Sequence, residues 1–155
     1  MMDVSVNPAD GGVACKHGPD ECIGNMLHLC AQHIYPLNLN TNGTSFLPFS
    51  ECLLHSFDLI PKEELIRSCA DKAGIDFQKL NSCISDLGDN GGIRMLTDSV
   101  EHSQDDGVRA SCTVRLAGKT RCVRDNGGWR DCEDGSKVKD LVRDIKREYE
   151  KNNGA

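Results

Sequence analysis

The chain has 155 residues, nine of them cysteine, and a formal net charge of −6 at pH 7. This length predicts a single domain over residues 1–155 with a modest core. The negative charge, without a long block of one sign, argues against a nucleic-acid partner. No apolar stretch approaches the length of a membrane-spanning helix, so no membrane partner is predicted either.

The N-terminal residues are rich in turn formers and carry neither an apolar run nor a basic leader. They therefore predict no signal peptide in this chain. Val4 and Val6 alternate with polar residues, which permits a brief strand. We expect residues 1–11 and 150–155 to be flexible.

Residues 15–30 read C-K-H-G-P-D-E-C-I-G-N-M-L-H-L-C and contain three cysteines. Gly18 and Pro19 mark a turn, because glycine tolerates positive φ and proline fixes φ. Pro19 followed by two acidic residues also suits the first turn of a helix. From Cys22 onward the apolar residues recur as in a mostly buried helix, and Pro36 ends it.

This stretch resembles the family of gamma-interferon-inducible lysosomal thiol reductases, whose shared pattern is C-Q-H-G-x-x-E-C-x-x-N-x-x-x-x-C. The pattern falls on Cys15, His17, Gly18, Glu21, Cys22, Asn25 and Cys30. The single departure is Lys16 in place of glutamine. S-C-T-V-R-L-A-G-K around Cys112 and R-C-V-R-D-N-G-G-W near Cys122 resemble one branch of the same family. The resemblance covers roughly residues 12–149.

The resemblance implies a thiol-disulfide oxidoreductase that reduces protein disulfide bonds. The family's active site is a C-x-x-C on a thioredoxin-like fold, upstream of the matching stretch. Here no two of the nine cysteines are three positions apart, and none precedes Cys15. The catalytic pair is therefore absent from this chain. We expect either an incomplete gene product or a catalytically silent relative, with Cys15 and Cys22 as weak catalytic candidates.

The middle of the chain predicts a loop and then helices. The loop over residues 36–49 contains a glycosylation sequon at Asn42, which has meaning only in the secretory pathway. Ser50 is expected to cap a short helix over residues 51–57. A second helix starts at Pro61 and ends before a glycine.

Two more helices follow. Asp76 is expected to cap the first of them. Its apolar residues at helical spacing are Phe77, Leu80, Ile84 and Leu87. The second runs from about Ile93 to His102 and is entered through two glycines.

After residue 110 the pattern changes to short segments with β-branched residues. Residues 110–116 and 120–124 predict a β-hairpin, with a loop over residues 125–128 and Trp129 packing on the sheet. The last helix is expected to run from Lys137 to Tyr149. It should bury Val138, Leu141, Val142, Ile145 and Tyr149.

The predicted fold class is α+β. We expect an incomplete thioredoxin-like fold with a large helical, disulfide-stapled insertion and a C-terminal β-hairpin plus helix. A hairpin followed by a C-terminal helix is similar to the final third of a thioredoxin-like fold. 

Nine cysteines indicate an oxidising compartment, and their odd number leaves at least one thiol unpaired within the chain, or paired with a lost segment. Cys22 and Cys30 lie about 12 Å apart along one helix, beyond the reach of a disulfide. Each must pair elsewhere or stay free. Beyond the motif, the candidates for disulfides are Cys52, Cys69, Cys83, Cys112, Cys122 and Cys132.

One pairing follows from the spacing. A turn with two glycines lies between Cys122 and Cys132, so the chain can fold back and join them. The alternative is that either of them pairs with Cys112 or with the helical region.

Other chemistry finds less support. A helix start and nearby cations could lower the pKa of the Cys22 thiol, although a structural disulfide is the commoner role. Cys15, His17 and Cys22 are zinc-ligand types, but no second clustered pair accompanies them, so no metal is predicted. No G-x-S-x-G or phosphate-binding glycine loop is present, and no cofactor is expected.

The sequence therefore predicts a thiol reductase-like protein that reduces disulfides poorly. Its partners would be disulfide-containing protein substrates. The resemblance places it in the secretory pathway, in an extracellular, lysosomal or vacuolar location. The alternatives are a non-enzymatic, disulfide-stabilised secreted domain and, third, a zinc-binding module.

Overall fold

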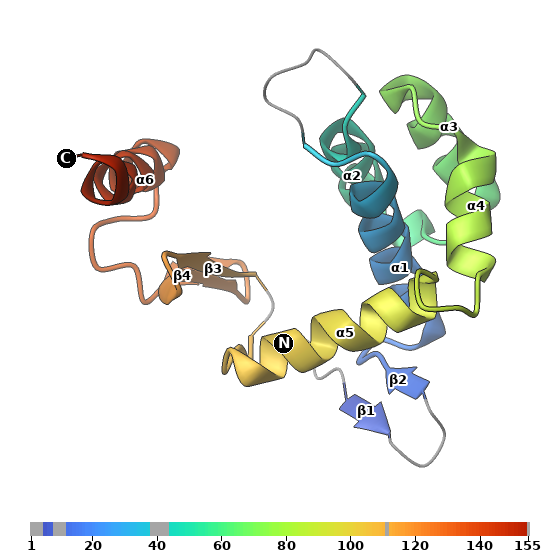
Figure 1. Ribbon diagram of the computed structural model, residues 1–155, viewed down its shortest axis with the longest axis horizontal. Coiled ribbons are helices and arrows are strands. Elements are labelled where there is room, and N and C mark those ends of the chain that lie inside the picture. Colours follow the sequence, from blue (N-terminus) through green and yellow to red (C-terminus); the bar gives the residue numbers. More distant parts are fainter. Residues whose placement is uncertain (1–4, 8–11, 38–43, 111, 155) are drawn as a thin grey trace. The chain divides into compact units, whose positions relative to one another are not determined.

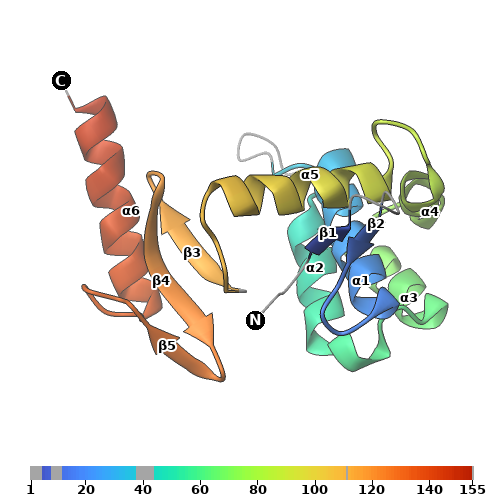
Figure 2. The same ribbon diagram turned by 90° about the horizontal axis from the view of Figure 1, so that it is seen from below.

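The computed structural model describes residues 5–7, 12–37, 44–110 and 112–154 (Figures 1 and 2). It contains two compact units. We call Val4–Asp105 the helical unit and Asp106–Ala155 the C-terminal unit. Helices dominate the first unit and the main strand pair lies in the second, as the change of pattern near residue 110 predicted. The single-domain organisation stays a prediction.

The helical unit begins with a small antiparallel sheet and continues with helices only. The strands are β1 (Ser5–Asn7) and β2 (Gly12–Ala14). The helices are α1 (Pro19–Ile34), α2 (Phe46–His55), the short 3₁₀ helix η1 (Phe57–Leu59), α3 (Glu63–Ala73), α4 (Phe77–Ser85) and α5 (Gly92–Asp105). Helix α1 contacts α2, α4 and α5, and so stands at the centre of this unit.

The core of the helical unit is built from the apolar faces of four helices. Its buried residues are Leu27, Cys30 and Ala31 of α1, Phe49 and Leu53 of α2, Ile66, Cys69 and Ala70 of α3, Ile75, and Leu80 of α4. Most of these side chains are fully buried, and burial of each large one stabilises the fold by roughly 1.5–3 kcal/mol. The apolar residues predicted for α1 and α4 therefore contribute to the core, together with those of α2 and α3.

The residues predicted to end α3 and to cap α4 are confirmed. Gly74 ends α3 in the left-handed region, with φ 67°, which glycine adopts at no steric cost. The Asp76 side chain accepts hydrogen bonds from the backbone N–H groups of Gln78 and Lys79 at 2.8 and 3.3 Å. It thereby caps α4 as predicted, satisfying donors that have no partner inside the helix.

Two boundaries were predicted wrongly. Helix α2 starts at Phe46, not after Ser50, because Pro48 fits its first turn, where a missing N–H costs nothing. Helix α4 ends at Ser85, since Asp86 adopts extended backbone angles. Leu87 consequently lies outside the helix and is 89% exposed, so it adds nothing to the core.

Ser50, displaced from its predicted capping role, instead links two helices. Its hydroxyl lies 2.9 Å from Nδ1 of His28, and this hydrogen bond joins α2 to α1. Burial lowers the pKa of His28 below the ordinary histidine value. The neutral imidazole is therefore favoured in the folded protein.

This shift predicts a pH-dependent stability of the helical unit. The unfolded chain binds a proton at His28 near pH 6.5 and the folded chain only at lower pH, so stability falls as the pH drops below about 6.5. We expect His28→Gln to flatten the melting temperature between pH 7 and 5. The exposed His33→Gln is the control, and an equal effect of both substitutions would contradict the assignment.

The C-terminal unit is a three-stranded antiparallel sheet followed by a helix. The strands β3 (Thr113–Leu116), β4 (Lys119–Asp125) and β5 (Gly128–Arg130) pair in that order, and α6 (Val138–Asn153) follows. The loop predicted over residues 125–128 is in fact a tight turn into a third strand. Both turns have two central residues with positive φ, Ala117-Gly118 and Asn126-Gly127, which is the pattern of the turns favoured in hairpins.

Trp129, predicted to pack on the sheet, belongs to β5 and is 41% exposed. It lies opposite Arg124 of β4, whose guanidinium carbon is 5.6 Å from the ring centroid. This cation–π contact stabilises the β4–β5 pair by an amount of order 0.5–1 kcal/mol.

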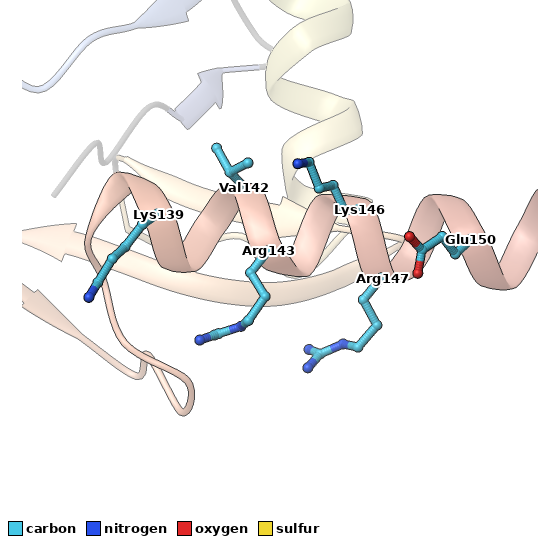
Figure 3. A pocket seen from close by; sticks show the side chains of 6 residues that line it. All are labelled: Lys139, Val142, Arg143, Lys146, Arg147 and Glu150. Atoms are coloured by element: carbon cyan, nitrogen blue, oxygen red, sulfur yellow. The ribbon is translucent and has the colours of Figure 1, made fainter.

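Helix α6 differs most from its prediction. Four of the five residues expected to be buried are exposed, and Leu141 is half-buried: the four are Val138, Val142, Ile145 and Tyr149. Figure 3 shows Val142 and Lys146 projecting from the same side of the helix. The fully buried side chain of α6 is instead a carboxylate, that of Asp144.

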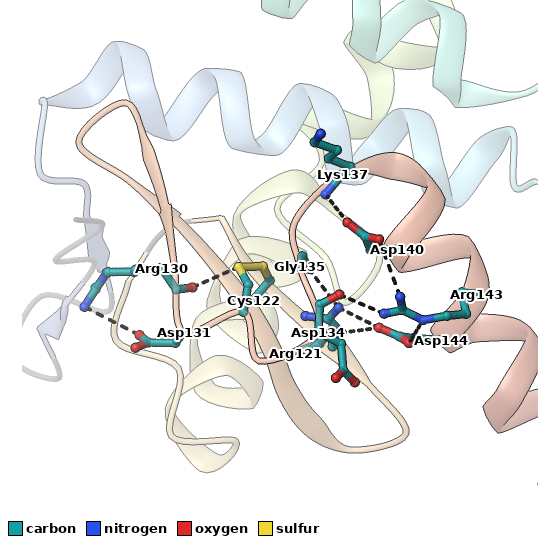
Figure 4. The surroundings of a disulfide bond; sticks show 11 residues. Arg121, Cys122, Arg130, Asp131, Asp134, Gly135, Lys137, Asp140, Arg143 and Asp144 are labelled. Carbon is teal, nitrogen blue, oxygen red and sulfur yellow. Dashed lines mark hydrogen bonds and ion pairs between the residues drawn. A yellow bond between two sulfur atoms is a disulfide. The ribbon is translucent and has the colours of Figure 1, made fainter.

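Ion pairs anchor α6 in place of an apolar face (Figure 4). Asp144 accepts hydrogen bonds from Nε of Arg121 on β4 at 2.7 Å and from Nε of Arg143 at 3.0 Å. Arg121 also donates to the carbonyl of Gly135 at 2.8 Å, and Arg143 to that of Asp134 at 2.8 Å. A buried carboxylate is tolerated because charged donors surround it.

Candidate functional site

Most of the motif residues that the resemblance singled out gather at the N-terminus of α1, while Cys30 lies further along the helix and is bonded to Cys83. Strand β2 leads directly into Cys15, and a turn follows in which the Gly18 N–H donates to the Cys15 carbonyl at 3.0 Å. Gly18 has φ 94°, a region that other residues enter only with strain. Pro19 then occupies the first turn of the helix. The sequence G-P therefore sets the path of the chain from strand to helix.

A disulfide closes this turn. Cys15 is bonded to Cys22 of α1, with 5.6 Å between their Cα atoms. The two weak catalytic candidates are thus brought together, and they are covalently joined. Both cysteines are half-buried, whereas each of the other three disulfides contains one fully buried cysteine: Cys30, Cys69 and Cys122.

Glu21 holds the same turn from the helix side. Its Oε2 accepts the backbone N–H of His17 at 2.8 Å and lies 3.2 Å from Nδ1 of that imidazole. The His17 side chain is 68% exposed, so its ring stands at the surface beside the disulfide loop. Asn25, the next motif residue, lies half-buried one turn further along α1. The conformation of the loop is therefore stabilised by His17, Gly18 and Glu21 together.

The chemistry available here is thiol-disulfide exchange. Cys22 lies near the N-terminus of α1, where the helix dipole and free N–H groups favour a thiolate once the disulfide is reduced. The exposed Lys16 adds positive charge in the same loop.

The remaining disulfides connect elements of each unit. Cys30–Cys83 joins α1 to α4 and Cys52–Cys69 joins α2 to α3, with Cα separations of 6.0 and 5.6 Å. Cys122–Cys132 joins β4 to the segment after β5, with a Cα separation of 4.6 Å. That last bond is the pairing predicted from the spacing.

Cys112, one of the disulfide candidates, has no disulfide in the described part of the chain. It lies just before β3, is exposed, and is the cysteine without a disulfide among those the structure describes. The other eight cysteines are paired with one another, which leaves Cys112 as the odd thiol that the count of nine required.

The structure leaves the zinc-binding alternative without two of its candidate ligands. The sulfur atoms of Cys15 and Cys22 are bonded to each other, so neither is a thiolate that can hold a metal. Within the described ranges, no group of three or more histidine, cysteine, aspartate or glutamate side chains is arranged to bind a metal ion. The described helices also include none that is both long and apolar enough to span a membrane.

A groove in the C-terminal unit, of about 900 Å³, lies between the β3–β4 hairpin and α6. Its charged lining residues are Lys119, Arg121, Arg147 and Lys151 on the positive side and Asp131, Glu133, Asp134 and Glu148 on the negative side. The charges balance, and Arg147 pairs with Asp134 and Lys151 with Glu148, so the groove carries no preference for one sign of ligand. None of the motif residues of α1 lines it.

Comparison with known proteins finds one family. Residues 3–73 match the family model of gamma interferon inducible lysosomal thiol reductase (GILT). A gamma-interferon-inducible lysosomal thiol reductase-like protein of Anopheles gambiae is 36% identical over 75 residues, which are 44% of this chain and 31% of that relative. The match thus spans about a third of the relative's length. No solved structure matches the chain.

Proposed function

Since the resemblance to the GILT family is confirmed over residues 3–73, we propose that the chain is a thiol reductase-like protein with weak activity of its own. Its substrates would be disulfide-containing proteins. The activity would be weak because the chain carries no C-x-x-C pair. The exchange that remains would take place at Cys15 and Cys22.

One observation carries this assignment. Cys15–Cys22 is the disulfide in which both cysteines are partly exposed, and it lies at a helix N-terminus. An attacking thiolate must approach one of the two sulfur atoms directly, so access decides which disulfide exchanges. In each of the other three pairs one cysteine is fully buried, so only the sulfur of its half-buried partner is open to attack.

The proposed cycle balances with a small thiol as reductant. Two molecules of the thiol reduce the Cys15–Cys22 disulfide and leave as their own disulfide. The Cys22 thiolate then attacks a substrate disulfide, forming a mixed disulfide and releasing one substrate thiolate, which takes up a proton. Cys15, deprotonated, attacks the mixed disulfide, releases the second substrate thiol and restores the Cys15–Cys22 bond.

The spacing explains why this cycle would be slow. Cys15 and Cys22 are seven positions apart, and Cys15 lies outside the helix. After reduction, the two thiols are kept close by noncovalent contacts, among them the turn and the contact between Glu21 and His17. The resolving step then competes with opening of the loop, which lowers the rate of turnover.

A non-enzymatic, disulfide-stabilised domain is the second candidate. The same bond ties β2 to the first turn of α1, and a bond in that position stabilises the unit whether or not it exchanges. The four disulfides fit an oxidising compartment and both candidates. The two candidates differ in turnover.

The test is a turnover assay with a disulfide-linked fluorogenic protein and a small thiol, at acidic and neutral pH. We expect slow turnover that disappears in Cys22→Ser and persists in Cys112→Ser, the matched control at an exposed cysteine. Far-UV circular dichroism verifies that each variant is folded. A wild-type rate at the uncatalysed background favours the non-enzymatic domain, and turnover lost in Cys112→Ser contradicts the assigned site.

Location and fold extend the proposal. The resemblance supports passage through the secretory pathway to an extracellular, lysosomal or vacuolar location. Asn42 lies outside the described residues, and its glycosylation stays a prediction that a mass shift on deglycosylation would test. The C-terminal hairpin followed by a helix supports the incomplete thioredoxin-like fold expected from the family.

A further inference from the structure

Helix α6 carries an apolar stripe that the described part of the C-terminal unit leaves at the surface. The exposed fractions are 77% for Val138, 44% for Val142, 55% for Ile145 and 68% for Tyr149. The inner side of the helix is held by Asp144 and its arginine partners, and not by these apolar residues. Nothing in the anchoring of α6 therefore uses the stripe.

The spacing of the stripe is that of a helix–helix seam. Its residues follow one another at intervals of four, three and four positions, which is the a/d repeat of coiled coils. The 16 residues of α6 span about 24 Å, enough to seat a partner helix over three turns or more. A stripe of this width is narrower than the apolar face of a helix that is buried in a core.

Positive charge borders this seam on its open side. A shallow groove of about 410 Å³ along α6 is lined by Lys139, Val142, Arg143, Lys146, Arg147 and Glu150 (Figure 3). Arg143 and Arg147 pair with aspartates of the same unit. Lys139 and Lys146 are seven positions apart and flank Val142 and Ile145, so they occupy equivalent places in two successive repeats.

We propose that this surface docks an amphipathic helix of another protein, whose apolar stripe is flanked by aspartate or glutamate. The stripe would supply the buried seam, and Lys139 and Lys146 would pair with the carboxylates of the partner. Charges at such flanking positions decide which helices associate. The proposal is independent of the thiol chemistry at Cys15 and Cys22.

A second copy of this chain fits the surface poorly. In an antiparallel pair that sets Val142 against Ile145, Lys139 of one copy faces Lys146 of the other, so like charges meet twice along one flank of the seam. In a parallel pair, Lys146 meets Leu141 and gains no carboxylate. The partner is therefore expected to differ in sequence and to be acidic where this chain is basic.

The experiment uses the full chain and two synthetic helical peptides that share leucine at the a and d positions. One peptide carries glutamate and the other lysine at the flanking positions. We expect the glutamate peptide to bind roughly tenfold more tightly, with a preference that shrinks at high salt. Calorimetry gives the affinities, and amide shifts of α6 locate the site.

Variants separate the contribution of the apolar stripe to binding from that of the two lysines. Ile145→Asp, at an exposed position, is expected to abolish binding without unfolding the unit. The double substitution Lys139→Glu and Lys146→Glu is expected to reverse the preference toward the lysine peptide. Lys72→Glu, an exposed lysine on α3, is the matched control and should leave the preference unchanged.

Several results would overturn the proposal. They are failure of the glutamate peptide to bind, equal affinity for both peptides, and protection of the stripe from hydrogen exchange in the free monomer. Self-association that Ile145→Asp removes would show that a second copy is the occupant. Binding of phosphatidylserine vesicles in preference to the glutamate peptide would show that the stripe is a membrane-binding face.

Discussion

Replacing both Cys30 and Cys83 by alanine is expected to lower the free energy of unfolding of the helical unit by about 4 kcal/mol. The bond closes a loop between residues 53 positions apart, the longest of the four, and its loss therefore frees the most chain entropy in the unfolded state. It also joins α1, at the centre of the unit, to α4. Cys30 is fully buried, so alanine adds a packing loss to the entropic one.

Urea denaturation followed by far-UV circular dichroism measures this loss. The matched control is the double alanine variant of Cys15 and Cys22, whose bond spans seven positions and should contribute only about 2–3 kcal/mol. An equal effect of the two double variants would show that loop length does not determine the stabilisation here.

The two bonds also show what a sequence can and cannot predict. Cys122–Cys132 was predicted because a turn lies between two cysteines ten positions apart, so the local chain decides the pairing. Cys30–Cys83 had no such signal, since it depends on how α4 packs against α1. Spacing excluded a bond between Cys22 and Cys30, which the structure confirms, but it did not supply the partner of either.

The candidate site was predictable for the same local reason. The turn at Gly18 and Pro19 and the first turn of the helix, which contains Cys22, lie within eight residues, and the structure has both. Five of the seven fixed positions of the motif lie in one loop, in which Glu21 holds the backbone of His17, while Cys30 forms the bond to α4. The sequence left open whether Cys15 and Cys22 are joined, because a turn permits both the bonded and the free state.

Helix α6 marks the limit of periodicity as a signal. Its apolar repeat identified a helix correctly, but a repeat does not say what covers the apolar face. The element that packs on α6 is a short hairpin, and it offers the guanidinium of Arg121 in place of an apolar surface. The carboxylate of Asp144, 23 positions from Arg121, is buried as its partner. No pattern in the sequence connects these two residues.

This buried carboxylate predicts an acid-sensitive C-terminal unit. Hydrogen bonds from Arg143, and further from Arg121, hold the pKa of Asp144 below its ordinary value in spite of burial. Other charged groups at this position are Arg147, which adds to the attraction, and Asp140, which pairs with Arg143. The folded state therefore binds a proton at Asp144 less readily than the unfolded chain does.

The stability that Asp144 confers should be complete above the ordinary aspartate pKa of about 4, and lost as the pH falls through the lower pKa of the folded state. We expect Asp144→Asn to remove this acid limb and to destabilise the unit at neutral pH, because the largely buried Arg121 loses its counter-charge. Trp129, the one tryptophan of the chain, reports unfolding of this unit by its fluorescence.

Melting curves of wild type and Asp144→Asn from pH 7 down to pH 3 decide the matter. Asp98→Asn is the matched control, since Asp98 forms an exposed pair with Arg94, of a kind that contributes little to stability. If the acid limb persists in Asp144→Asn, another carboxylate governs it. If Asp98→Asn destabilises the chain as much as Asp144→Asn does, burial of the Arg121–Asp144 pair is not what stabilises the C-terminal unit.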